Sequence, residues 1–152
     1  MLAEEQVDFV VLGGFAAIVH GSPLPTEDID VIPSRDLPNL ERLATALKRL
    51  GAKIRRSDEP VETKIDAAFL LNMPRMLNLV TSLGDLDLVF APAGLLTNYE
   101  QWLERARRAQ LRDGVIVTVA NLDDIIASKT AANRPKDQRL LPYLESLRDQ
   151  LG

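Results

Sequence analysis

This 152-residue chain contains no cysteine. That absence excludes disulfide bonds and thiolate metal sites and is typical of a reducing compartment, so a cytoplasmic protein is expected. His20 is the only histidine. It stands at the end of a short expected helix, where capping of free carbonyl groups is its expected role, and without a second histidine a metal role is not expected. One histidine and no cysteine cannot form a Ser-His-Asp or Cys-His relay. The chain has no basic-then-apolar leader and no apolar run of about eighteen residues, so neither secretion nor membrane insertion is predicted.

The bulk composition is that of a folded protein. Hydrophobic residues make up 46% of the chain and charged residues 26%, and the length suits one domain over 1–152 rather than two. The net charge is −4 and the pI is near 5.0. This balance argues against tight nonspecific binding to nucleic acid, so any RNA contact has to be local.

A strand, a glycine turn and a helix are predicted near the start of the chain. Residues 9–12 form a short apolar run of strand type that breaks at Gly13 and Gly14, and residues 15–20 read as a short helix. Glycines at such a turn leave backbone N–H groups uncovered, and the helix N-terminus adds partial positive charge. The pair therefore predicts a phosphate cradle at Gly13 and Gly14, with an ordinary helix-capping pair as the alternative.

Two acids follow on the next predicted strand, residues 28–32. Because side chains alternate along a strand, Ile29 and Val31 face one side while Asp28 and Asp30 face the other. Two like charges on one face repel each other unless a cation lies between them, and Mg²⁺ accepts one or two protein carboxylates together with phosphate oxygens. A merely polar strand face is the alternative, but acids that follow a glycine turn in this order favour a metal-phosphate site.

These residues carry a family resemblance. Leu12-Gly13-Gly14 followed by Asp28-Ile29-Asp30 resembles the motifs of the nucleotidyltransferase superfamily, the one with the DNA polymerase beta type of fold. The chain is most similar to small bacterial proteins grouped with AbiEii-type toxins and minimal nucleotidyltransferases. The resemblance implies an α+β (mixed α/β) fold, with a mixed β-sheet, flanking helices and a C-terminal helical pair over 121–152.

A third acid is expected on a hairpin predicted over 77–90. Asp87 stands in an otherwise apolar strand, where an ionised carboxylate is costly without a compensating cation. The family places an acid on the strand next to the Asp-x-Asp strand, so the resemblance implies Asp87 as the third metal ligand. Asp85, two residues earlier on the same face, is the alternative, and Asp87 could also occupy an exposed alternate position.

The run from Lys129 to Asp137, KTAANRPKD, resembles a signature near the end of this nucleotidyltransferase group. By that resemblance Lys129 faces the active cleft and touches phosphate, while Arg134, Lys136 and Asp137 are structural or assist the incoming substrate. From the residues alone, Lys129 could equally be a lysine whose stem packs on apolar surface while its ammonium reaches water.

Periodicity and capping signals predict the remaining elements. Trp102 and Leu103 are the expected core anchors of their helix, and 65–71 is ambiguous between strand and helix. The predicted segments are helices over 39–50, 98–109, 122–132 and 136–151, and a strand over 115–119.

Two basic stretches interrupt the acidic balance. A solvated helix face is the simpler explanation, and contact with a triphosphate or with the phosphodiester of an acceptor is the alternative. The first comprises Arg42, Lys48, Arg49, Lys53, Arg55 and Arg56, and the second Arg105, Arg107, Arg108 and Arg112.

These features together predict Mg²⁺-dependent (or Mn²⁺-dependent) transfer of a nucleoside monophosphate from an NTP to a hydroxyl acceptor. The expected roles are metal binding and catalysis for Asp28, Asp30 and Asp87, phosphate binding for Gly13 and Gly14, and charge compensation by Lys129. The acceptor suggested by the resemblance is a tRNA 3′ end or a protein side chain, in a toxin–antitoxin setting with a cognate partner protein. The alternatives are a catalytically inactive protein of this fold that binds a partner, and a metal-assisted phosphatase.

Overall fold

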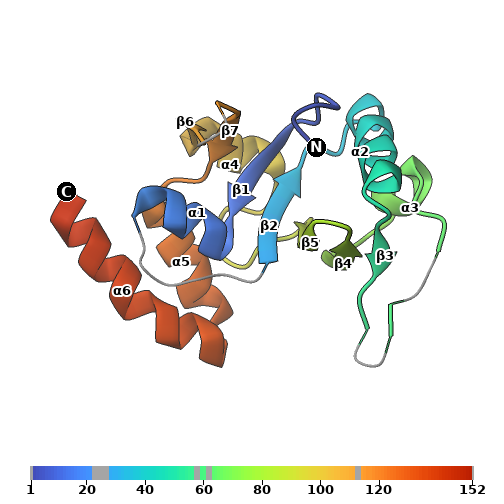
Figure 1. Ribbon diagram of the computed structural model, residues 1–152. Coiled ribbons are helices and arrows are strands. Elements are labelled where there is room, and N and C mark those ends of the chain that lie inside the picture. Colours follow the sequence, from blue (N-terminus) through green and yellow to red (C-terminus); the bar gives the residue numbers. More distant parts are fainter. Residues whose placement is uncertain (1, 22–27, 57–58, 61–62, 112–113, 152) are drawn as a thin grey trace.

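The computed structural model describes residues 2–21, 28–56, 59–60, 63–111 and 114–151. They form a seven-stranded mixed sheet flanked by helices, which confirms the predicted fold class (Figure 1). The strand order is β3-β4-β5-β2-β1-β7-β6. The β1–β7 and β2–β5 pairs are parallel, and the other pairs are antiparallel.

The elements occur along the chain in this order: β1 (Phe9–Leu12), α1 (Gly13–His20), β2 (Asp28–Pro33), α2 (Leu37–Arg49), β3 (Lys53–Ile54), α3 (Ala67–Leu71), β4 (Met76–Thr81), β5 (Gly84–Val89), α4 (Tyr99–Arg105), β6 (Arg107–Gln110), β7 (Ile116–Val119), α5 (Leu122–Ala132) and α6 (Pro135–Leu151).

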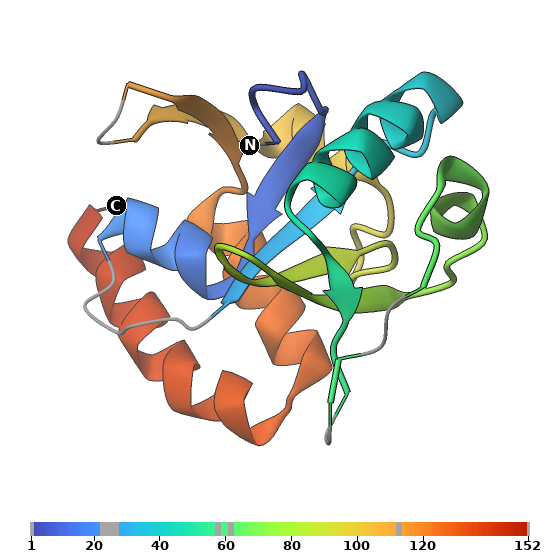
Figure 2. The ribbon, with the colours of Figure 1, turned by 45° about the vertical axis from the view of Figure 1, so that its right-hand side comes forward.

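The two faces of the sheet have different covers. Trp102 of α4 and Ile125 of α5 share a cavity with Asp30, so these helices lie over the face that carries the acids. Leu50, at the end of α2, lines a hollow with Val31, and so α2 covers part of the opposite face (Figure 2). The helices α1, α5 and α6 gather at one end of the molecule, and α2 and α3 gather at the other.

A buried asparagine fastens the start of α2 to the sheet. Asn39 is fully buried. Its Nδ2 donates to the backbone oxygens of Asp8 (3.0 Å) and Ser34 (2.8 Å), and its Oδ1 accepts from the Asp8 N–H at 2.7 Å. Because every one of these buried polar groups is paired, Asn39 holds α2 against β1 and β2 without an unsatisfied donor or acceptor.

The helix predicted over 98–109 is too long. It ends at Arg105, and residues 107–110 form strand β6, which pairs with β7. Ala106 is already extended, with φ −79° and ψ 166°. Trp102 is buried at 2% exposure, but Leu103 is 41% exposed, so the prediction of Leu103 as a core anchor is wrong. Neighbouring residues on a helix point in different directions, and only one of the two reaches the core.

Capping explains several boundaries. The ambiguous segment 65–71 contains helix α3, because the Asp66 side chain caps it by accepting from the Phe69 N–H at 2.9 Å. Asn121 caps α5 in the same way through the Asp124 N–H, as predicted. Helix α1 begins at Gly13 rather than at residue 15.

Two expectations for the helices need correction, and one strand was not predicted. The leucine spacing over residues 136–151 predicts that Leu151 points inward on α6, but Leu151 is 64% exposed, whereas Leu144, predicted in the same way, is fully buried. His20 does not cap its own helix: its Nε2 lies 2.9 Å from the Ala120 oxygen, and Gly21 provides the C-cap of α1. The short strand β3 was not foreseen, because two residues carry no readable periodicity.

Among the described residues, no helix has the length and apolar character needed to cross a membrane.

Candidate functional site

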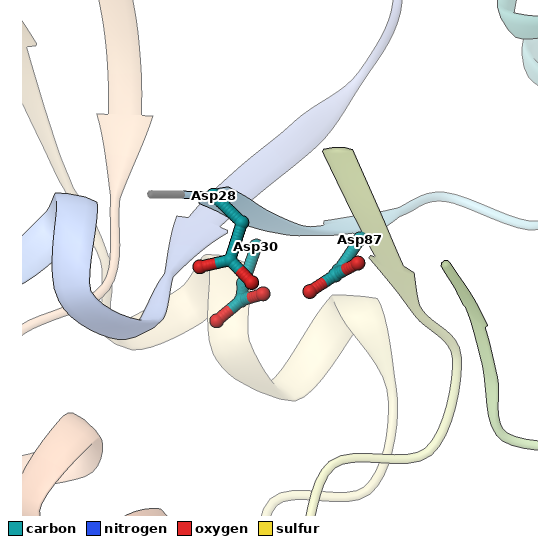
Figure 3. Close-up of side chains that lie close together, drawn as sticks. All are labelled: Asp28, Asp30 and Asp87. Atoms are coloured by element: carbon teal, nitrogen blue, oxygen red, sulfur yellow. The ribbon is translucent and has the colours of Figure 1, made fainter. Parts of the chain in front are cut away.

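Three carboxylates converge where strands β2 and β5 run side by side. The parallel register sets Asp30 opposite Asp87 and Asp28 opposite Asp85. One carboxylate oxygen from each of Asp28, Asp30 and Asp87 lies within 4.8 Å of the others. Figure 3 shows the three side chains pointing toward one another from the two strands. The register of two strands, distant in sequence, therefore assembles the acidic cluster.

The cluster is electrostatically unfavourable without a cation. Burial, together with hydrogen bonding to Asp28 and the charge of Asp30, raises the pKa of Asp87 from its ordinary value of 3.8 to about 7. Burial and the charge of Asp28 also raise the pKa of Asp30. The charge of Arg55 offsets part of this repulsion, and a proton or a metal ion can offset the rest. Carboxylate oxygens are the ligands that Mg²⁺ and Mn²⁺ prefer, so the donor set fits the predicted metal.

The two candidates for the third acid have different neighbours. Asp87 is buried and belongs to the cluster, whereas Asp85 lies outside the grouped carboxylates. The Asp85 Oδ2 lies 3.2 Å from Arg55 Nη1, and its side chain is 38% exposed. Asp85 is therefore engaged by an arginine beside the cluster, and Asp87 is the acid that joins Asp28 and Asp30.

Gly13 makes room for the second acid. Its φ is +64°, and a Cβ built there would overlap the Asp30 carboxylate, chiefly at Oδ2. Only glycine combines this left-handed backbone with so close an approach. The sequence suggested a phosphate cradle at Gly13 and Gly14, and the structure adds a steric reason for the first of them. The two glycines begin α1 beside the acids, and phosphate binding by their amides stays a prediction.

A buried carboxylate joins two of the three cations in the C-terminal signature, Lys129 and Arg134. Asp137 is fully buried. Its Oδ1 lies 3.4 Å from Lys129 Nζ, and its Oδ2 lies 2.7 Å from Arg134 Nε. Burial alone would raise the pKa of Asp137, but the hydrogen bonds from Arg134 and the positive charges outweigh it and lower the pKa. Asp137 is thus an ionised anchor that sets the positions of Lys129 and Arg134.

Asp30 of the acidic cluster lines one cleft together with Lys129 and Arg134. The cleft has a volume of about 310 Å³. The charges of Lys129 and Lys136 act on Asp30, and those of Asp30 and Asp28 act on Arg134, so the cations lie within electrostatic range of the cluster. Among the residues that line the cleft are Gly13, Asp30, Trp102, Ser128, Lys129 and Arg134.

Sequence reasoning missed the specific partners of several basic residues. Arg55, assigned to a basic stretch, pairs with Asp87, and Arg105 of the second stretch donates its Nε to Asp124 at 2.8 Å. Arg75 lines the cleft and was not singled out at all. Charge clustering indicates where cations occur, but not which acid each one reaches, because those acids lie elsewhere in the sequence.

Known structures share this fold. The structure of the lincosamide antibiotic adenylyltransferase LnuA with lincomycin bound matches with a TM-score of 0.62 and 15% identity, over 96% of this chain and 90% of that one. ANT(2″)-Ia in complex with adenylyl-2″-tobramycin matches with a TM-score of 0.60 and 15% identity, over 99% and 83%. A putative nucleotidyltransferase from Thermotoga maritima, TM1012, matches with a TM-score of 0.52 and 13% identity, over 99% and 88%.

No protein-family model matches the chain, and no curated protein shows significant sequence similarity to it. The nucleotidyltransferase fold implied by the glycine and Asp-x-Asp motifs is therefore confirmed by structural likeness alone. The narrower AbiEii-type grouping stays a prediction. At these identities the likeness establishes the fold, and activity has to be argued from the site.

Proposed function

We propose that this protein is a metal-dependent nucleotidyltransferase that moves a nucleoside monophosphate from an NTP to a hydroxyl acceptor. The observation that carries the proposal is the convergence of Asp28, Asp30 and Asp87 within 4.8 Å at the edge of a cleft lined by Lys129 and Arg134. Phosphoryl transfer is catalysed by carboxylates that hold metal ions and by nearby basic side chains that offset phosphate charge. The acidic cluster, Lys129 and Arg134 have this arrangement.

The three acids would hold Mg²⁺ or Mn²⁺. A bound ion would neutralise phosphate charge and favour ionisation of the attacking hydroxyl. The residues of the chain supply the remaining requirements. Asp30 is held against Gly13, and Asp87 is held by Arg55, so both ligands have restricted positions before substrate binds. Such restriction lowers the cost of reorganisation during the reaction.

The reaction forms one bond and breaks one. The acceptor oxygen bonds to the α-phosphorus of the NTP, the bond from that phosphorus to the bridging oxygen breaks, and pyrophosphate leaves. Asp87 is the carboxylate proposed to orient the acceptor hydroxyl and to receive its proton. Lys129 and Arg134, both on the cleft wall, would offset the negative charge that accumulates on pyrophosphate. The Gly13 and Gly14 amides would contact the β- and γ-phosphates at the start of α1.

The acceptor class is proposed to be a hydroxyl-bearing molecule. Two proteins of the same fold have structures with lincomycin and with adenylyl-2″-tobramycin, so small antibiotic acceptors join the tRNA 3′ end and the protein side chain suggested by the sequence resemblance. A toxin–antitoxin role with a cognate partner protein stays a prediction.

The test is transfer of label from α-³²P-labelled NTPs in the presence of Mg²⁺ or Mn²⁺, with lincosamide, aminoglycoside, tRNA and total protein as acceptors. Wild type should give a labelled acceptor and pyrophosphate, and the Asp28→Ala/Asp30→Ala variant should give neither. Asp123→Ala/Asp149→Ala is the matched control, because it removes two exposed carboxylates that belong neither to the cluster nor to the cleft lining. Equal transfer by wild type and the double variant would contradict the proposed mechanism, and phosphate release without an acceptor would indicate a phosphatase instead.

A further inference from the structure

Arg55 connects the edge of the sheet to the acidic cluster. It follows β3, the edge strand, and its backbone N–H donates to the Asn78 oxygen of β4 at 2.9 Å. Its side chain crosses β4 and reaches β5, where Nη2 donates to Asp87 Oδ1 at 2.9 Å and Nη1 lies 3.2 Å from Asp85 Oδ2. A single guanidinium therefore bridges two carboxylates that lie on the same face of β5.

The bridge occupies part of the Asp87 carboxylate and leaves the rest for the cluster. With Oδ1 engaged by Arg55, rotation of the carboxylate about its χ2 angle would break a charged hydrogen bond. Asp87 is 4% exposed, so water cannot easily replace that partner. The Nη1 atom is buried, and its 3.2 Å approach to Asp85 has ion-pair distance without hydrogen-bond geometry. Two nitrogens of the guanidinium thus contact the two acids, while the Arg55 side chain as a whole is 29% exposed.

We infer that Arg55 is a positioning residue for the proposed metal site, holding the Asp87 carboxylate in the orientation in which it meets Asp28 and Asp30. This inference rests on the proposed function, because it assigns Arg55 a task at that site. Residues that orient metal ligands through hydrogen bonds typically change metal affinity by about 10- to 100-fold when they are replaced. The edge strand β3 thereby becomes part of the site although none of its residues belongs to the cluster.

When Arg55 is replaced, a positioning role and simple charge repulsion predict opposite changes in metal affinity. Arg55 is a cation beside a cation site, so its charge alone repels Mg²⁺ or Mn²⁺, and neutralising it should tighten metal binding. Loss of a positioning contact should weaken binding instead. The direction of the change in metal affinity therefore separates the two roles, and it does so without any measurement of catalysis.

The experiment is titration of full-length protein with Mn²⁺, followed by electron paramagnetic resonance and by calorimetry. The variants are Arg55→Gln, Arg55→Lys and the matched control Lys53→Gln. Lys53 is an exposed cation two residues earlier on β3, and it forms no ion pair among the described residues. Its replacement changes the net charge as Arg55→Gln does and leaves the bridge to Asp87 intact. Circular dichroism and thermal melts establish that each variant is folded.

We expect Arg55→Gln to weaken Mn²⁺ binding by about tenfold or more, and Lys53→Gln to leave it unchanged or slightly tighter. Arg55→Lys should also weaken binding, because an ammonium group cannot span two carboxylates as the planar guanidinium does. Tighter binding in Arg55→Gln, or equal binding in all four proteins, would overturn the inference. If Arg55→Gln does not fold, Arg55→Lys provides the test. Wild-type Mn²⁺ affinity in Arg55→Lys would then overturn the positioning role of Arg55.

The outcomes also separate this inference from the proposed function. If wild type binds Mn²⁺, loses affinity in the Arg55 variants and yet transfers no nucleotide to any acceptor, the positioning role stands and the proposed activity fails. If wild type transfers nucleotide while Arg55→Gln keeps or gains metal affinity, the activity stands and the positioning role fails. Absence of Mn²⁺ binding by wild type would overturn the positioning role.

Discussion

Replacing Gly13 by alanine tests the close packing between the glycine turn and Asp30. Two separate costs are expected. The first is backbone strain, because Gly13 has φ +64° and the left-handed region costs a residue with a Cβ about 1 to 2 kcal/mol. The second is overlap, since the new Cβ would occupy the position of Asp30 Oδ2. Forced rotamer and backbone shifts of this kind cost about 1 to 3 kcal/mol.

Gly51→Ala provides the matched control for the first cost. Gly51 has φ +62°, almost the value at Gly13, but a Cβ there meets no described atom within 4 Å. Its replacement should therefore lower the free energy of unfolding by the strain alone, about 1 to 2 kcal/mol. Gly13→Ala should lower it by roughly 2 to 5 kcal/mol, the sum of strain and overlap. The difference between the two variants isolates the contact with Asp30.

Two measurements check this expectation. Urea unfolding of both variants gives the difference in stability, and Mn²⁺ titration reports whether Asp30 has been displaced from the cluster. Gly13→Ala should bind Mn²⁺ more weakly than wild type, and Gly51→Ala should bind it equally well. The reasoning is refuted if Gly13→Ala is no less stable than Gly51→Ala and binds Mn²⁺ with wild-type affinity.

Three further predictions concern charge. The pKa of Asp87 is raised from 3.8 to about 7, so the stability linked to its proton is complete below about pH 4 and is lost as pH rises through 7 in metal-free protein. In urea unfolding with EDTA, Asp87→Asn should flatten this decline of the free energy of unfolding with pH. An unchanged slope would contradict the raised pKa of Asp87. Mg²⁺ should raise the melting temperature more at pH 8 than at pH 5, because protons compete with the metal for Asp87. An equal rise of the melting temperature at pH 5 and pH 8 would count against a metal site that includes Asp87. Asp137→Asn should destabilise the fold by about 3 to 5 kcal/mol and weaken NTP binding, because Lys129 and Arg134 lose their buried anchor. Calorimetry with a non-hydrolysable NTP measures this binding, and wild-type affinity in the variant would contradict the anchoring role of Asp137.

Local signals in the sequence determined much of the framework. Alternation along residues 28–32 put Asp28 and Asp30 on one face, because strand side chains alternate whatever the strand pairs with. The hairpin over 77–90 and the Asn121 cap of α5 were likewise predicted, and the structure confirms both. Strand alternation, a hairpin and a helix cap each depend on residues a few positions apart, so they can be predicted directly from the sequence.

Tertiary pairing decided the remainder. The parallel register of β2 and β5 brings Asp87 to Asp30 across 57 positions of sequence, and Arg55 reaches Asp87 only because β3 and β4 lie beside β5. The helix predicted past Arg105 gives way to β6 because pairing with β7 satisfies its backbone groups. Long-range hydrogen bonds of this kind leave no local periodicity. The acids could therefore be nominated from the sequence, while their meeting point and the arginine that orients one of them depended on the folded sheet.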